Sequence, residues 1–236
     1  MKICGLMKVT LLDYPGHVAC TAFTGGCNFR CPFCYNSELI DMNAPAVMEI
    51  DELYKFLESR VGRLEGVAFT GGEPTLHPEL PDVMRHIKGY FGMEIKLDTN
   101  GTNPDMLYEI LCEGIAEYVA MDIKASPDNY GKAAGIDISR EMMAKITSSK
   151  DMLIKGGPVV HEFRTTVVGG LHGDEDFEGI RDYIKGAANY FLQRYTENDN
   201  VLCKDRGFYS PSKEELERYL EIVKPAVGHA AIRGVD

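Results

Sequence analysis

The sequence predicts an α/β fold built on a parallel sheet, and two features of the chain support this prediction. Short apolar runs of strand length alternate with longer segments whose apolar residues recur at helical spacing. The chain has 236 residues, 44% hydrophobic and 26% charged, which is ordinary globular composition. Alternation over the whole length implies parallel strands with right-handed crossovers. Six or seven βα units can be counted, so we expect a partial (β/α)6-type barrel, open on one side.

The strands of this sheet are expected in segments that are short, apolar and rich in β-branched residues. In chain order, these segments are residues 17–24, 66–70, 93–98, 118–123, 159–168, 190–195 and a short last strand at 230–233.

Helices are expected between the strands, each with one apolar face. The first begins near Asp51, a good N-cap residue, and continues to Leu64. Ser212 and Glu215 form a capping-box pattern at the start of the last helix, which Pro225 ends. The remaining helices are predicted at 80–91, 106–112, 140–154 and 177–188. Two loops, 126–138 and 196–211, are long enough to suggest a function.

The chain shows no internal repeat or linker, so the sequence predicts a single domain over residues 1–236. Within it, residues 16–200 would form the barrel core. Residues 201–236 would add a C-terminal helix and strand as an extension.

Charge and hydropathy exclude several classes of protein. The net charge is −11 and no basic run occurs, so we do not expect binding to nucleic acid. No apolar run reaches the roughly 18 residues of a membrane span. The start of the chain lacks the apolar core of a signal peptide. We therefore expect a cytoplasmic protein without a membrane partner.

Three of the seven cysteines, Cys27, Cys31 and Cys34, lie on one loop directly after the first predicted strand. In a reducing compartment such a group indicates metal or redox chemistry. The spacing Cys-x3-Cys-x2-Cys allows one loop to place three thiolates around a single iron–sulfur cluster. Such clusters usually take four thiolates, so three would leave one iron open to a substrate or cofactor.

Other interpretations of these cysteines remain open. A structural zinc site would need a fourth ligand such as Cys4, Cys20 or His17, and Cys31 with Cys34 alone could form a redox dithiol. Cys20 and Cys112 lie in apolar surroundings and are expected in the core. No second Cys-x2-Cys occurs, which argues against an auxiliary cluster.

Polar residues follow the ends of successive predicted strands. In chain order they are Gly71, Gly72 and Glu73, then Asp98 and Asn100, then Asp122 and Lys124. Active sites of parallel α/β sheets lie at the C-terminal strand ends, so these residues are candidates for a site. Asp122 and Lys124 could also simply pair with each other. Arg164 lies within a strand, where it either contacts a ligand or pairs with Glu162 or another acid.

The cysteine motif, with Phe33 just before its last cysteine, resembles the signature of radical S-adenosylmethionine (SAM) enzymes. The resemblance implies a radical SAM barrel and two cofactors, a [4Fe-4S] cluster and SAM. Cys27, Cys31 and Cys34 would hold the cluster, and its open iron would chelate the amino and carboxylate groups of SAM. Reduction would then release methionine and a 5′-deoxyadenosyl radical, and Phe33 would lie near the adenine.

The same resemblance implies roles for the residues at the strand ends. Gly71-Gly72-Glu73 is similar to the family's GGE element, whose backbone contacts the SAM amino group. Asp98 and Asn100 belong to an Asp-Thr-Asn-Gly segment similar to one that contacts SAM. Asp122 and Lys124 would contact the SAM ribose and carboxylate, and Arg164 would bind SAM if it is not paired.

Residues 9–16 together with 23–34 resemble the activating enzymes of glycyl radical enzymes, in particular those of anaerobic ribonucleotide reductase and pyruvate formate-lyase. This resemblance implies hydrogen abstraction from a backbone glycine of a partner glycyl radical enzyme. Anaerobic ribonucleotide reductase is the expected partner, with a flavodoxin or ferredoxin-type reductant. Tyr35 departs from the pattern, because many activases have histidine after the last cysteine.

Two other functions remain open. One is a radical SAM enzyme that acts on a small molecule, similar to carboxy-deazaguanine synthase. The other is a non-catalytic interaction module stabilised by zinc or by a cluster.

Overall fold

The computed structural model describes residues 1–157, 159–197, 201–203 and 207–234. Its strands follow the order β3-β1-β2-β4-β5-β6-β7-β8-β9 in one sheet that does not close. The chain divides into two compact units. Unit 1 comprises residues 1–28, 38–120 and 156–160, and unit 2 comprises residues 29–37, 121–155 and 161–236.

The strands of unit 1 include a parallel core. β2 (Ala19–Thr24), β4 (Gly66–Gly71) and β5 (Glu94–Thr99) are parallel, with Ala19 opposite Gly66 and Gly66 opposite Glu94. β1 (Lys2–Thr10) and β3 (Met48–Glu49) were not predicted, and β1 pairs with both β2 and β3 in the antiparallel sense. The prediction of a wholly parallel sheet is therefore wrong at this end, because no crossover helix separates β1 from β2.

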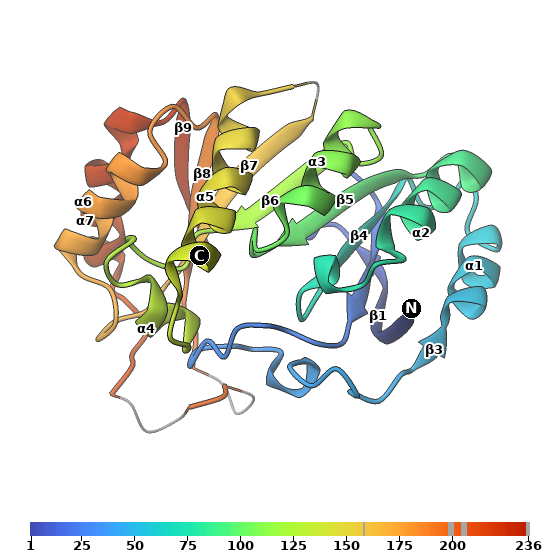
Figure 1. Ribbon diagram of the computed structural model, residues 1–236, viewed down its shortest axis with the longest axis horizontal. Coiled ribbons are helices and arrows are strands. Elements are labelled where there is room, and N and C mark those ends of the chain that lie inside the picture. Colours follow the sequence, from blue (N-terminus) through green and yellow to red (C-terminus); the bar gives the residue numbers. More distant parts are fainter. Residues whose placement is uncertain (158, 198–200, 204–206, 235–236) are drawn as a thin grey trace. The chain divides into compact units, whose positions relative to one another are not determined.

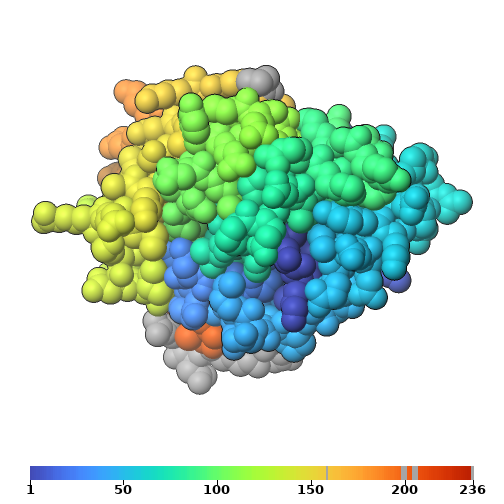
Figure 2. Space-filling view, turned by 45° about the vertical axis from the view of Figure 1, so that its right-hand side comes forward, coloured from blue at the N-terminus to red at the C-terminus, as the bar shows by residue number. Residues whose placement is uncertain are grey.

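The α-helices of unit 1 are α1 (Ile50–Glu58), α2 (Leu80–His86), continued by a π-helical turn (Ile87–Phe91), and α3 (Pro104–Cys112). The cap of α1 is Glu49, which forms a capping box with Glu52, so Asp51 lies in the first turn instead of at the cap. The helix also ends before Val61 and Leu64. Tyr54 of α1 contacts His86 and Phe91, so these two helical segments lie side by side (Figure 2).

One strand of unit 1, β5, carries a buried lysine. Lys96 of β5 is 1% exposed. Its Nζ atom pairs with Asp98 and lies 5.8 Å from the centre of the Tyr118 ring. Since a buried charge is costly unless it is paired, Asp98 stabilises Lys96 in this position. Tyr118 begins β6 (Tyr118–Asp122), whose last two residues belong to unit 2.

Unit 2 has three parallel strands, β7 (Val160–Val167), β8 (Asn189–Arg194) and β9 (His229–Arg233). Its helices are α4 (Tyr130–Ala134), α5 (Arg140–Lys155), α6 (Asp174–Tyr183) and α7 (Lys213–Val223) (Figure 1). α4 lies inside the segment that was predicted as the loop 126–138. α6 begins before the predicted residue 177, because its acidic first turn follows the N-cap Gly173.

The capping box of the last helix is confirmed. The Ser212 hydroxyl accepts a hydrogen bond from the Glu215 N–H at 3.2 Å, and the Ser212 N–H donates to the Glu215 carboxylate at 2.8 Å. α7 packs against α6 through stacked rings of Phe177 and Tyr219, whose centroids are 4.2 Å apart. This contact buries the apolar face of α7 that the sequence predicts.

Two buried charges hold unit 2 together. Glu162 of β7 is fully buried and accepts two hydrogen bonds from the Arg233 guanidinium of β9, both at 2.8 Å. Arg233 also lies 3.4 Å from the centre of the Phe191 ring on β8. Lys150 of α5 is 8% exposed and donates to the carbonyl oxygen of Tyr183 at 2.8 Å.

Three sequence predictions concern the chain as a whole, namely its membrane spans, its domain bounds and the long loop 196–211. Within the described ranges, no helix is both long and apolar enough to cross a membrane. α7 and β9 lie in the predicted extension 201–236, but the single domain over 1–236 and its core 16–200 remain untested. Within the predicted loop 196–211, residues 198–200 and 204–206 lie outside the described residues.

Candidate functional site

The second half of the cysteine loop belongs to unit 2. The Cys34 N–H donates to the Cys31 carbonyl at 3.0 Å, so a tight turn joins the two cysteines. The loop is held from outside by the Arg30 N–H, which donates to the carbonyl of Ala134 at the end of α4 at 2.8 Å. Gly135 has a φ of +68°, and a Cβ atom there would lie 1.9 Å from the Arg30 carbonyl oxygen. Glycine at this helix end therefore allows the loop to approach.

Phe33 is 4% exposed and packs edge-on against the His172 ring at 6.3 Å. The His172 Nδ1 atom accepts a hydrogen bond from the Val168 N–H at 3.0 Å, so Nε2 donates to the Lys124 carbonyl, 2.8 Å away. Burial lowers the pKa of His172, which keeps the ring neutral. His172 thus connects the ring of Phe33 to the backbone of Lys124, a role that no motif in the sequence predicts.

The first half of the cysteine loop belongs to unit 1. The Gly26 N–H donates to the Leu39 carbonyl at 2.8 Å, and the Cys27 N–H donates to the Ile40 carbonyl at 3.0 Å. Cys27, Cys31 and Cys34 take part in no disulfide. Cysteine thiolates are the donor type that iron–sulfur clusters take, so the donor chemistry of the loop fits such a group, while in the described part of the chain the side chains are not already gathered into a three-ligand metal site.

The glycines at the end of β4 pack against the stem of the cysteine loop, residues 24–26. Gly71 has a φ of +121°, and a Cβ atom at Gly72 would lie 2.0 Å from the Gly26 carbonyl oxygen. The Gly72 N–H donates to Thr24 at 2.9 Å and the Glu73 N–H donates to Gly26 at 2.7 Å, both to carbonyl oxygens. Only residues without a side chain permit this backbone contact.

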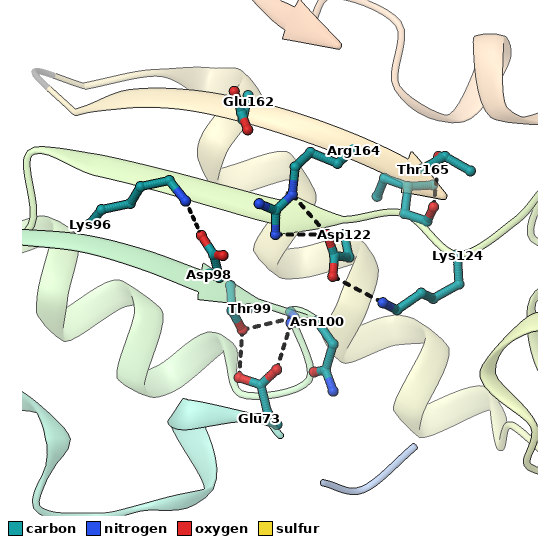
Figure 3. A network of polar contacts seen from close by, with 12 residues as sticks. Glu73, Lys96, Asp98, Thr99, Asn100, Asp122, Lys124, Glu162, Arg164 and Thr165 are labelled. Carbon is teal, nitrogen blue, oxygen red and sulfur yellow. Dashed lines mark hydrogen bonds and ion pairs between the residues drawn. The ribbon is translucent and has the colours of Figure 1, made fainter. Parts of the chain in front are cut away.

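The carboxylate of Glu73 is 1% exposed and accepts four hydrogen bonds, of which those from Thr99 and Asn100 can be followed in Figure 3. One oxygen accepts from the N–H and hydroxyl of Thr75 at 3.1 and 2.6 Å and from the Thr99 hydroxyl at 2.8 Å. The other accepts from the Asn100 N–H at 2.6 Å. Burial raises the pKa of Glu73, and these hydrogen bonds oppose that rise. The side chain therefore fixes the end of β5.

Asn100 continues this network towards the cysteines. Its side-chain amide donates to the side-chain Oδ1 atom of Asn28 at 2.8 Å, and the Asn28 side-chain amide donates to the Thr102 hydroxyl at 2.8 Å. Asn28 directly follows Cys27, yet the sequence analysis did not select it. The other candidate at the end of β5, Asp98, pairs with Lys96. Glu73, Asn100 and the loop stem are thus gathered within unit 1.

Three charged candidates come together in unit 2 (Figure 3). Asp122 pairs with Lys124 through one carboxylate oxygen at 2.9 Å, and with the Nε and Nη2 atoms of Arg164 through the other, both at 3.0 Å. Of the alternatives for Arg164, pairing with an acid other than Glu162 is therefore the one observed. Glu162 instead pairs with Arg233.

The charges within this group shift the pKa values of Asp122 and Lys124. Burial opposes ionisation of Asp122, but the cations of Arg164 and Lys124 outweigh burial and lower its pKa to about 2. Burial would likewise lower the pKa of Lys124, but Asp122 and the Cys31 thiolate raise it above its ordinary value. With two cations and one carboxylate, the group has a surplus positive charge that suits an anionic ligand group.

The other cysteines are engaged elsewhere. The Cys4 thiol lies 3.5 Å from the Ala44 carbonyl, and His17 bonds to the Pro15 carbonyl at 3.1 Å. Cys20 is fully buried, as predicted, and burial raises the pKa of its thiol to about 12. Cys112 is exposed at the end of α3, so its predicted place in the core is wrong.

Comparisons with known proteins bear on this arrangement. The family model described as the Radical SAM superfamily matches residues 21–184. A Methanocaldococcus jannaschii protein named as a glycyl-radical enzyme activating enzyme is 27% identical over 236 residues, covering 99% of this chain and 96% of that protein. A Pyrococcus abyssi protein named as a GTP 3′,8-cyclase is 27% identical over 208 residues, covering 84% of this chain and 64% of that protein.

The fold also has solved relatives. The crystal structure of a domain of pyruvate-formate lyase-activating enzyme from Bacteroides vulgatus matches with a TM-score of 0.54 and 18% identity. The match covers 72% of this chain and 99% of that chain. This likeness supports the open α/β fold.

Proposed function

Because the chain belongs to the radical SAM superfamily, we propose that it is the activating enzyme of a glycyl radical enzyme. The cofactors of this family are a [4Fe-4S] cluster and SAM. When bound and reduced, they supply a 5′-deoxyadenosyl radical, which would abstract a hydrogen atom from a backbone glycine of the partner. The glycyl radical so formed is delocalised over the flanking peptide groups, which favours the abstraction.

Cys27, Cys31 and Cys34 are proposed to bind the cluster. The observation that best supports this role is the contact of Phe33, inside the loop, with the His172 ring at 6.3 Å, because His172 Nε2 donates to the Lys124 carbonyl at 2.8 Å. The cysteine loop and the polar strand ends of unit 2 are thus neighbours. Since the motif has three cysteines, one iron would remain available to SAM.

The charged group of unit 2 is proposed to bind the polar parts of SAM. Lys124 and Arg164 would attract its carboxylate, and Asp122 would accept hydrogen bonds from the ribose hydroxyls. Asp122 also keeps the two cations in fixed positions before SAM arrives, at 2.9 and 3.0 Å. Preorganised charges of this kind lose little conformational entropy on binding.

The proposed contacts of unit 1 come mainly from its backbone. The GGE segment, Gly71, Gly72 and Glu73, would present its carbonyl groups to the SAM amino group, because the carboxylate of Glu73 is already occupied by four donors. Asp98 and Asn100 are proposed as further contacts to SAM, and Phe33, in unit 2, as the residue beside the adenine.

The proposed partner is anaerobic ribonucleotide reductase, and the proposed electron donor is a flavodoxin or ferredoxin-type protein. The relative named as a glycyl-radical enzyme activating enzyme supports this class of partner, since the match extends over nearly all of both chains. The resemblance of residues 9–16 and 23–34 to ribonucleotide reductase activases supports the choice of partner.

A second candidate is a radical SAM enzyme that acts on a small molecule. The relatives named as GTP 3′,8-cyclases favour it, although the chain spans only 64% of the Pyrococcus abyssi protein. The two functions differ in substrate while sharing the cleavage of SAM, so a substrate assay separates them.

The first experiment tests the shared chemistry. The protein is reconstituted anaerobically with iron and sulfide, reduced and mixed with SAM, and 5′-deoxyadenosine is measured. We expect its release by the wild type and by Cys112→Ala, the control at an exposed thiol, and its loss in Cys31→Ala. Zinc binding in place of a cluster would contradict the proposal.

The second experiment tests the partner. The reduced enzyme with SAM is incubated with anaerobic ribonucleotide reductase, and electron paramagnetic resonance (EPR) is used to detect a glycyl radical. Its formation in the reductase would support the activase. A GTP-derived product, without any glycyl radical, would support the second candidate instead.

A further inference from the structure

Tyr35, which directly follows Cys34, is fixed to the segment after β8. Its hydroxyl oxygen accepts a hydrogen bond from the Thr196 N–H at 2.6 Å. Its ring stacks on that of Tyr195, with centroids 5.9 Å apart and planes inclined by 16°. Tyr195 is 4% exposed and its N–H donates to the Val167 carbonyl, so it belongs to the core of unit 2. Tyr35 is therefore attached to a well-packed part of the unit.

A second attachment joins the same two segments. The Cys203 N–H donates to the carbonyl oxygen of Pro32 at 3.0 Å. Pro32 lies between Cys31 and Cys34, inside the turn that joins them. Chain segments on both sides of residues 198–200 thus bond to the stretch from Pro32 to Tyr35, and neither contact involves a cysteine thiol.

These contacts restrict the part of the loop that presents two of the proposed cluster ligands. A free loop loses conformational entropy at every residue that becomes ordered. If contacts outside the ligands order the loop beforehand, metal binding does not have to meet that cost. Residues that orient ligands in this way typically alter metal affinity by about 10–100-fold when they are mutated.

We propose that Tyr35 is a positioning residue that holds Cys31 and Cys34 in place for the cluster, through its stacking on Tyr195 and its hydrogen bond from Thr196. This inference rests on the cluster of the proposed function. It extends that function by giving a role to the residue in which the sequence departs from the activase pattern. The flat ring supplies the stacking surface and the phenol oxygen supplies the acceptor, so the two contributions can be removed separately.

The test measures the rate at which the reconstituted holoprotein loses iron to a chelator under anaerobic conditions, followed by the visible absorption of the cluster. Tyr35→Phe removes the acceptor and keeps the stack, and we expect iron loss to be about 3–10 times faster. Tyr35→Leu removes both, and we expect an increase of about 30-fold. The EPR signal of the reduced cluster should broaden in the same order, because its ligands are held less uniformly.

Tyr209→Phe is the matched control. Its hydroxyl donates to Glu215 of α7 at 3.0 Å on the exposed surface of unit 2, so the same atom is removed from a tyrosine whose hydroxyl bonds to a helix side chain instead of to Thr196. We expect its rate of iron loss to equal that of the wild type. The urea midpoint of the cluster-free protein should change little in Tyr35→Phe, which separates ligand positioning from general destabilisation.

The outcomes distinguish this inference from the proposed function. If the wild type assembles no cluster, the proposed function fails. If the cluster forms and Tyr35→Phe and Tyr35→Leu lose iron at the wild-type rate, only the role of Tyr35 is overturned. An equal acceleration in Tyr209→Phe would overturn it as well.

Discussion

A Cβ atom at Gly72 would lie 2.0 Å from the carbonyl oxygen of Gly26, so the segment after β4 and the stem of the cysteine loop meet backbone to backbone. Real Cβ contacts essentially never fall below 3.0 Å. Two hydrogen bonds, from the Gly72 and Glu73 N–H groups, hold this contact together. The conformation of the stem therefore depends on a glycine that lies far from it in the sequence.

Gly72→Ala is expected to displace the stem and lower the amount of iron bound after anaerobic reconstitution. Forcing a methyl group into a packed site also costs about 1–3 kcal/mol of unfolding free energy. Iron per protein and urea unfolding measure the two effects. Gly89→Ala, where a Cβ atom would meet nothing within 4 Å, serves as the control. Full iron content in Gly72→Ala would contradict the importance of the contact.

Glu73→Gln is expected to reduce the unfolding free energy by about 1–3 kcal/mol, because an NH2 group would face donors that need an acceptor. All four hydrogen bonds to this side chain come from Thr75, Thr99 and Asn100. Urea unfolding of the cluster-free protein measures the change. Glu58→Gln, on the exposed end of α1, should stay within about 0.5 kcal/mol of the wild type.

Asp122 should make stability depend on pH in the acid range. Its pKa is about 2 in the folded protein, against an ordinary value of 3.8. Between these values the unfolded state binds more protons, so the stability that Asp122 contributes is present above pH 3.8 and is lost as the pH falls towards 2. The urea midpoint of the cluster-free protein should therefore fall less steeply in Asp122→Asn. Parallel pH profiles for the two proteins would refute this.

Arg233→Met is expected to cost about 3–5 kcal/mol of unfolding free energy, because it removes both guanidinium hydrogen bonds from the fully buried Glu162 carboxylate. The double variant Glu162→Met with Arg233→Met should recover most of the loss. Arg218→Met breaks an exposed pair with Asp174 and should leave the unfolding free energy close to that of the wild type. A similar loss in the single and double variants would show that packing of the arginine matters more than its charge.

Local patterns predicted most of the regular elements. α7 and its capping box follow from Ser212 and Glu215, and α5 begins at Arg140 as predicted. β1 was missed because residues 2–10 mix exposed apolar and polar side chains without clear alternation. α4 is too short for helical periodicity to be recognised. Its C-terminal glycine, Gly135, was the available signal.

The candidate site was predictable where its chemistry is local. The spacing of Cys27, Cys31 and Cys34 is contained in a single loop, and the family match over residues 21–184 agrees with it. The pair of Asp122 with Lys124 was among the alternatives, but the partners of Arg164 and Glu162 were not predictable, because they come from other strands. Arg164 bonds to Asp122 across 42 positions, and Glu162 bonds to Arg233 across 71. Sequence spacing cannot decide between such partners.

Lys96 in unit 1 and Lys150 in unit 2 are 1% and 8% exposed, and both amines are engaged by neighbouring groups. Acylating reagents modify accessible, deprotonated amines, so these two lysines should resist labelling while each unit is folded. Mass spectrometry after brief labelling in increasing urea would then report the opening of each unit through its own lysine. Comparing the urea concentrations at which Lys96 and Lys150 become labelled would show whether the two units unfold together or one after the other.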